Sequence, residues 1–278
     1  MKKIQIAITA IAALIGTSAF AADMALKAAP PAPPPVPTWT GFYAGFDAGW
    51  AQGDQNASTN ATPSPGFGAP AIDGAGLAGI GLLPTSHDLD GGSALGGVHA
   101  GYNWQTANWV FGVEGDFMFV DRDVNNTQSL NATFTPLTVP NAGTMTVSAD
   151  NNWLASARGR LGWAMGSWMP YATGGAAWTK TFYTANYAPA NLAPAPSPTS
   201  VSFSDTKTGW VAGGGFEWRY APQWVIRAEY LYYGFDGSSA ILPFGPAGSC
   251  TAGHCNWNVN TGTLQFQVVR AGVSYKFF

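Results

Sequence analysis

The chain has 278 residues and a formal net charge of -3 at pH 7, and only 10% of its residues are charged. An ordinary soluble domain has about 25% charged residues and about 7% glycine, whereas this chain contains 35 glycines and 12 tryptophans. Its mean hydropathy of +0.03 indicates that apolar residues are interleaved with polar ones, which argues against a helical membrane protein, whose spans each need about 20 consecutive apolar residues. The acidic balance also argues against nucleic-acid binding.

Residues 1–21 have the pattern of a secretory signal peptide. Two lysines are followed by an apolar run that ends at Ile15, and Ala19 and Ala21 occupy the small-residue positions of a cleavage site. A membrane anchor is the alternative, but the run is too short and no second hydrophobic span follows it. We therefore expect cleavage after Ala21 and export of the remaining chain.

Residues 22–37 form a proline-rich leader. Its composition prevents helix and sheet and is typical of a semi-rigid polyproline II spacer. The remaining residues, 38–278, are then expected to form the folded domain.

Only two cysteines occur, Cys250 and Cys255, and they lie five positions apart. In an exported chain this spacing predicts a small disulfide loop. A metal site that includes His254 is disfavoured, because it has only three candidate ligands and no further cysteine or histidine nearby. We expect no cofactor.

Eight segments of the folded domain alternate apolar and polar residues with a period of two, as β-strands do. In the first, Phe42, Phe46 and Trp50 share one face and Asp47 lies on the other. Seven segments show the pattern clearly: 41–50, 93–105, 109–119, 153–163, 207–219, 224–232 and 269–277. The fifth in chain order, 168–179, has no clear apolar face because glycine and alanine dominate it.

No charged residue falls on the apolar face of the seven clear segments, and that face is rich in aromatic residues, alanine and glycine. A soluble sandwich would place polar residues on its outward face, so this pattern predicts contact with lipid. The predicted fold is all-β, an eight-stranded antiparallel transmembrane up-and-down β-barrel.

The connections between the segments alternate in length. They are tight at 105–108, 165–168 and 221–223 and long at 51–91, 121–151, 181–206 and 236–262. Because such barrels have short periplasmic turns and long extracellular loops, we expect both termini in the periplasm.

Charged residues on the polar faces are predicted to fill the lumen, because an eight-stranded barrel leaves an interior just wide enough for side chains. The predicted lumen set is Asp47, His99, Glu114, Asp116, Arg158, Arg160, Glu217, Arg219, Arg227, Glu229, Arg270 and Lys276. Two interpretations remain open: a structural polar plug that closes the barrel, and a narrow solute path or ion-selective constriction lined by the arginines.

Tight turns also predict which charges face one another. A turn at Thr106 and Ala107 puts His99 opposite Glu114, and a turn centred on Pro222 puts Glu217 opposite Arg227. Unlike charges directly opposed across two strands support each other. Counted from their turns, Glu114 and Asp116 should meet Arg158 and Arg160 at one level of the lumen.

Enzyme functions are less compatible with the sequence. An acyl hydrolase needs a serine beside a histidine, but His87 and His254 lie in predicted loops and His99 in the lumen, so none shares a lipid-facing strand with a serine. Residues 74–79 match G-x-G-x-x-G, but a nucleotide site needs that motif between a strand and a helix. We predict no enzymatic activity.

Several stretches carry a family resemblance. They are Trp-Thr-Gly-Phe-Tyr-Ala-Gly at 39–45 and the aromatic, glycine-rich stretches 153–163, 171–178, 209–218 and 269–277. With the signal peptide and leader, they make the chain similar to the small outer-membrane immunogenic, opacity-like "porin family" barrels of Gram-negative bacteria. The resemblance implies an eight-stranded barrel in outer-membrane lipid.

The resemblance also implies two partners. The outer-membrane assembly machinery reads a C-terminal aromatic in this family, and Tyr275 and Phe277 match that ending, although the extra Phe278 leaves open which phenylalanine acts. Some related barrels begin Ala-Asp and are linked through that amine to peptidoglycan, which makes Ala22 a candidate attachment point. The alternative role of the leader is a solvated lead into the first strand.

Three function classes follow: a structural surface protein that contributes to envelope integrity, a narrow channel, and a protein whose loops bind a host factor, haem or phage. The sequence leaves the oligomeric state open.

Overall fold

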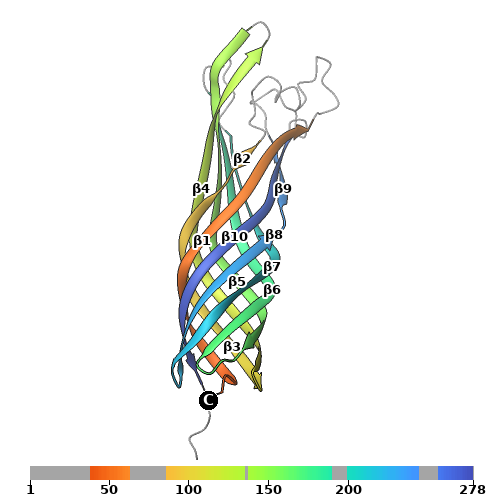
Figure 1. Ribbon diagram of the computed structural model, residues 1–278. Coiled ribbons are helices and arrows are strands. Elements are labelled where there is room, and N and C mark those ends of the chain that lie inside the picture. Colours follow the sequence, from red (N-terminus) through yellow and green to blue (C-terminus); the bar gives the residue numbers. More distant parts are fainter. Residues whose placement is uncertain (1–37, 63–85, 135–136, 190–198, 244–255, 278) are drawn as a thin grey trace, which may run out of the picture. The chain divides into compact units, whose positions relative to one another are not determined.

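The computed structural model describes residues 38–62, 86–134, 137–189, 199–243 and 256–277 (Figure 1). Residues 37–278 form one compact unit. The predicted signal peptide, leader, glycine motif and cysteine loop, with Ala22 and Phe278, lie outside the described residues. Within the described ranges, no helix is long and apolar enough to cross a membrane.

Ten strands make up the described fold. They are β1 (Gly41–Thr62), β2 (His87–Asp88), β3 (Gly91–Thr106), β4 (Trp109–Phe134), β5 (Leu137–Trp163), β6 (Trp168–Pro189), β7 (Thr199–Ala221), β8 (Trp224–Phe235), β9 (Ser238–Pro243) and β10 (Asn256–Lys276). Each pairs antiparallel with its neighbour, and β1 pairs with β10 to close the ring.

Two of the ten strands are continuations of others. Gly53 faces Gly91 and Ala57 faces His87, so β2 prolongs β3 along β1 in one register. In the same way β9 prolongs β8 along β10. The ring therefore has eight strands, and the prediction of an eight-stranded antiparallel barrel is confirmed.

The lipid-facing belt occupies the end of the barrel that holds the C-terminus, which we call the lower end (Figure 1). Large apolar side chains are exposed there in alternation, for example Phe46 at 73% and Phe119 at 67%. Trp109 stacks edge-on against Trp163 with ring centroids 4.7 Å apart, and Trp168 lies on Trp218 at 5.5 Å. The membrane-spanning segments are 42–50, 94–104, 109–119, 153–163, 168–178, 210–218, 224–232 and 269–277.

The weak fifth segment is a strand as predicted. In β6, Met169, Tyr171 and Thr173 are buried, whereas Ala172 and Gly174 are exposed. Alanine and glycine occupy the lipid-facing side of β6. Because these residues are only weakly hydrophobic, the hydropathy of the sequence does not show the alternation of buried and exposed side chains that the strand has.

The strands run far beyond their predicted ends, so the predicted long connections contain much more strand than expected. β4 and β5 continue to Phe134 and Leu137 and make most of 121–151 a hairpin. The alternation persists above the belt, but the outward residues there are polar, and the prediction relied on an aromatic outward face. A shift of register between Phe119 and Arg122 marks the transition between the two regions.

Above the belt the barrel separates into two sheets. The pairing of β3 with β4 ends at Leu95 and Val120, and that of β7 with β8 ends at Gly209 and Phe235. We call β2, β1, β10 and β9 the first sheet and the upper parts of β4, β5, β6 and β7 the second sheet.

The two sheets pack on a small apolar core, as in a β-sandwich. Ala57 and Leu89 come from the first sheet, and Met145, Val147 and Tyr183 from the second. This sandwich is the upper end of the molecule.

Candidate functional site

A network of buried charges fills the lumen at the level of the lipid belt. It contains four arginines and five carboxylates, each exposed by 7% or less: Arg158, Arg160, Arg227, Arg270, Asp47, Glu114, Asp116, Glu217 and Glu229. Alternation brings them inward from six strands, because every second side chain of a strand faces the same side. Buried charges are stable only when they are paired and hydrogen-bonded.

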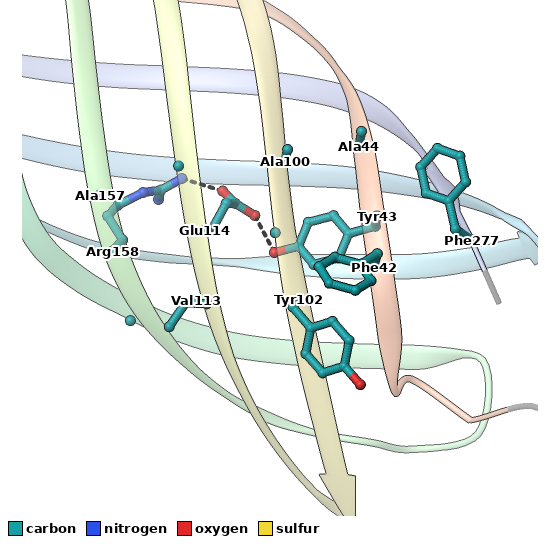
Figure 2. A pocket seen from close by; sticks show the side chains of 13 residues that line it. Phe42, Tyr43, Ala44, Ala100, Tyr102, Val113, Glu114, Ala157, Arg158 and Phe277 are labelled. Carbon is teal, nitrogen blue, oxygen red and sulfur yellow. Dashed lines mark hydrogen bonds and ion pairs between the residues drawn. The ribbon is translucent and has the colours of Figure 1, made fainter.

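Glu114 is the centre of the network. Its carboxylate accepts from Arg158 at 2.5 Å, Arg227 at 2.8 Å and Arg160 at 3.2 Å. The hydroxyl of Tyr43 donates to it at 2.8 Å. Figure 2 shows Glu114 between Arg158 and Tyr43, inside the wall formed by β1, β3, β4 and β5. One carboxylate thus contacts three guanidinium groups.

The other carboxylates complete the pairing. Asp47 accepts a forked pair of hydrogen bonds from Arg227 at 2.5 and 2.7 Å. Glu229 lies 2.8 Å from Arg158 and 2.6 Å from Arg270. Both of these arginines also reach Asp116, at 3.0 and 3.3 Å.

The structure corrects one predicted register and qualifies the other. His99 lies opposite Asp116, not Glu114, because the turn contains Ala107 and Asn108. Ala107 takes a left-handed backbone with φ of 53°, and this conformation moves the turn one residue beyond the predicted site.

Glu217 does lie opposite Arg227, as predicted. The Glu217 carboxylate, however, contacts Arg160 at 2.5 Å, whereas Arg227 reaches Asp47. Arg160 and Arg227 thus meet partners across the lumen, whereas Arg158 and Arg270 contact the carboxylates directly beside them on the sheet, Glu114 and Glu229. Glu114 and Asp116 do meet the arginines of β5 at one level.

Two predicted members of the lumen set lie outside the central network, at the lower mouth. The Arg219 guanidinium stacks over the ring of Trp39 at 4.2 Å, and the Lys276 ammonium donates to the carbonyl of Thr38 at 2.5 Å. Trp39 is 3% exposed and packs with Val110, among others. The segment before β1 therefore contributes Trp39 to an apolar cluster at the lower mouth.

The sequence prediction missed a second buried arginine site, in the upper part of the lumen. Arg122 donates to Asn151 Oδ1 at 3.0 Å, to the carbonyl of Gly91 at 3.1 Å and to the carbonyl of Leu89. Its inward direction follows from the alternation of β4, which continues beyond the aromatic belt. This side chain joins β4 and β5 to the first sheet at a level where β3 and β4 no longer pair through their backbones.

Other polar side chains bridge the two gaps between the sheets. The amides of Asn126 and Gln128 donate to the carbonyls of Asp88 and Ser86 at 3.1 and 3.0 Å. On the opposite side, the Lys207 ammonium donates to Ser238 Oγ at 2.6 Å. Burial lowers the pKa of Lys207.

His87 is a pH-sensitive part of this upper region. Its imidazole is fully buried, and burial lowers its pKa despite opposing effects of Asn126 and Asp88. Since the folded state favours the neutral ring, we expect stability that is present above the unfolded pKa of about 6.5 and lost as pH falls toward the lower folded pKa. Urea midpoints at pH 8, 6.5 and 5 measure this loss.

The control for this prediction is His87→Gln. Its midpoint should change less between pH 8 and pH 5 than that of the native protein. An equal change in both proteins contradicts the assignment to His87.

His99 has a serine neighbour that sequence reasoning missed. Its Nε2 lies 2.7 Å from Ser274 Oγ, and its Nδ1 lies 2.9 Å from Asp47. A serine, a base and an orienting carboxylate form the arrangement of a nucleophilic site. Ser274 is 2% exposed, and the adjoining cavity has a volume of about 10 Å³, which holds at most one water.

The larger hollows lie on the lipid-facing wall. One, of about 740 Å³, lies over Ala44, Ala100 and Ala157, and Phe42 and Phe277 stand at its edge (Figure 2). Small side chains on neighbouring strands create this depression, which faces lipid. The aromatic residues of the predicted assembly signal lie beside it: Tyr275 and Phe277 have ring centroids 5.1 Å apart, and Phe277 is 48% exposed.

No group of three or more metal-ligating side chains occurs in the part of the chain that the structure describes.

Comparisons with known proteins agree with this architecture. A family model described as outer membrane protein beta-barrel domain matches residues 9–277. The 31 kDa outer-membrane immunogenic proteins of Brucella melitensis biotype 1 and Brucella suis biovar 1 are each 30% identical over 198 residues, which cover 69% of this chain and 70% of theirs.

Solved structures with a similar strand arrangement include the attachment invasion locus protein Ail of Yersinia pestis, at 15% identity and a TM-score of 0.33 over 85% of this chain and 99% of that one. The outer membrane protease OmpT of Escherichia coli matches at 8% identity and a TM-score of 0.45 over 85% and 97% of the two chains. The chain belongs to the outer membrane protein beta-barrel domain family and is a surface-exposed protein of the outer membrane of a Gram-negative bacterium.

Proposed function

We propose that this barrel is a closed structural protein that contributes to envelope integrity and presents a surface for interactions. The observation that carries the proposal is the central network, whose nine charged side chains are buried and bonded to one another across the lumen. Groups that served an ion path would need contact with water. Here the charges contact each other.

Apolar layers above and below the network support the same conclusion. Leu231, Tyr233 and Phe266 belong to a buried cluster directly above it. Trp39 and Val110 belong to the cluster below it. A solute on the barrel axis would have to displace both apolar layers and separate the ion pairs between them.

A non-enzymatic role is part of the proposal. The Ser274 and His99 pair is enclosed by the network and by the lower cluster, since its cavity of about 10 Å³ is lined by Trp39, Tyr43 and Lys276 among others. A substrate has no room beside the hydroxyl.

We expect the purified protein to show no steady conductance in planar lipid bilayers. Arg160→Ala should also remain non-conducting, because the apolar layers persist when one charge is removed. Single-channel recording at several voltages measures both. A large and stable conductance of the native protein contradicts the closed lumen and favours the second candidate, a narrow channel lined by the arginines.

A further inference from the structure

The edge of the sandwich at β2 is held by few hydrogen bonds. Two residue pairs join β2 to β1, Asn56 with Asp88 and Ala57 with His87. Toward β4, the described contacts of segment 86–91 are made by side chains and not by paired backbones. A change at one of these side chains can therefore release this edge without disturbing the ring of eight strands below it.

Asn126 connects β4 to β2 through both ends of its amide group. The amide nitrogen donates to the carbonyl of Asp88 at 3.1 Å, and the amide oxygen lies 3.3 Å from His87 Nδ1. Since an amide oxygen can only accept, Nδ1 carries the proton of the neutral imidazole. The other ring nitrogen, Nε2, then has a lone pair and no proton.

His87 Nε2 is buried and has no hydrogen-bond partner among the described residues. The side chain is 0% exposed, and Ala57 lies directly opposite it on β1. Both residues are on the interior side of the sandwich, which contains Met145 and Val147. A second proton on the ring would place a charge and an N–H donor in this apolar core, and an unpaired buried charge is costly.

The charged groups around His87 do not supply the missing partner. The other titratable side chains described on the interior side of the sandwich are Arg122, Tyr183, Asp205 and Lys207, and Asp205 accepts from Ser238. Those on the outward side are Asp54, Asp88, Asp90, Asp121, Asp123, Asp150 and Lys180. Asp88 favours the charged ring, but burial outweighs this effect and lowers the pKa of His87.

We propose that His87 is a pH-sensitive switch whose protonation releases β2 from β4 and opens this edge of the sandwich, while the barrel below stays folded. The ring takes up its second proton when it turns out of the core into water, and this movement separates Nδ1 from Asn126. Below the usual histidine pKa of about 6.5, each unit of pH favours the open form by up to about tenfold, until the lower pKa of the closed form is reached.

The open edge does not open the lumen. The buried cluster that contains Leu231 and Phe266 lies between the sandwich and the central network. The inference is therefore independent of whether the lumen conducts, and its failure would leave the proposed function unchanged.

The accessibility of a cysteine at position 57 tests the proposal. Ala57→Cys is introduced into the full chain in phospholipid nanodiscs, with Cys250 and Cys255 replaced by serine. Its reaction with 4,4′-dithiodipyridine is timed at pH 8 and pH 5, with native His87 and with His87→Gln, because glutamine can donate to Asn126 but takes up no proton. The ratio of the two rates should rise at least about fivefold from pH 8 to pH 5.

A matched control uses Ala177→Cys, since Ala177 is also an inward alanine with 0% exposure but belongs to the cluster above the central network. Its rate ratio should be the same at both pH values. An unchanged ratio at Ala57→Cys overturns the proposal. An equal rise at both cysteines also overturns it, because the whole barrel then loosens and not the edge at β2.

Two further measurements separate the switch from a general effect of acid. Asn126→Ala removes the connection itself, so it should raise the accessibility of Ala57→Cys already at pH 8, and an unchanged rate contradicts the role of Asn126. In NMR spectra of the histidine rings, assigned with His87→Gln, His87 should become protonated over the pH range in which Ala57→Cys becomes accessible. Protonation without any gain in accessibility overturns the proposal.

Discussion

Glu114→Ala is expected to lower the free energy of unfolding by about 3 to 5 kcal/mol, the cost of leaving a buried charge uncompensated. Glu114 accepts hydrogen bonds from Arg158, Arg160 and Arg227, so its loss affects more than one partner. Urea unfolding in phospholipid vesicles, followed by tryptophan fluorescence, gives the midpoint. Arg160→Ala should act in the same direction, because it leaves Glu217 without its guanidinium partner at 2.5 Å.

Two variants make this prediction specific. Glu114→Gln keeps the shape of the side chain and removes its charge, so it should also destabilise the barrel. Thr206→Ala, at an exposed position of β7, should change stability by no more than about 0.5 kcal/mol. If Glu114→Ala and Glu114→Gln both unfolded at the same urea concentration as the native protein, the network would contribute little to folding.

Phe266→Ala is the second substitution with a large expected effect, about 3 to 5 kcal/mol from the lost apolar contacts and the cavity that remains. The Phe266 ring is 1% exposed and meets the ring of Phe235 edge-on at 6.3 Å. The guanidinium of Arg122 stands over its other side at 5.7 Å. The substitution therefore leaves a cavity in the apolar layer that separates the central network from the upper sandwich.

The control for Phe266→Ala comes from the same strand. Val269 faces lipid with 61% exposure, and Val269→Ala should shift the unfolding midpoint far less. If the two variants unfold at the same urea concentration, the interior of the barrel is not packed as described.

Which face meets lipid could be predicted from the sequence for seven of the eight membrane-spanning strands, all except 168–179. A barrel wall is one strand thick, so every side chain points either to lipid or to the lumen. The neighbouring residues Phe46 and Asp47 show this, because Phe46 faces lipid and Asp47 faces the lumen. The same reasoning placed Glu114 and Arg158 in the lumen.

The meeting of Glu114 and Asp116 with the arginines of β5 was predicted, but the partners that come from more distant strands were not. Backbone register sets only the neighbour on the next strand, and an arginine reaches beyond that neighbour, as Arg160 does when it contacts Glu217 from a different part of the ring. The upper strands escaped prediction for another reason. Their outward residues, such as Thr146 and Ser148, are polar, and their inward residues are a mixture of apolar and polar side chains, so the alternation gives a weak signal.

The segment before β1 determines how the barrel bears a force applied at its N-terminal side. The amide of Trp39 donates to Gln105 of β3 at 2.7 Å, and Lys276 of β10 holds the carbonyl of Thr38. The Trp39 ring lies against Arg219 of β7. Tension on the chain that enters Thr38 is therefore distributed over three strands before it reaches β1, so β1 is loaded in shear as part of the wall and is not peeled away from its end.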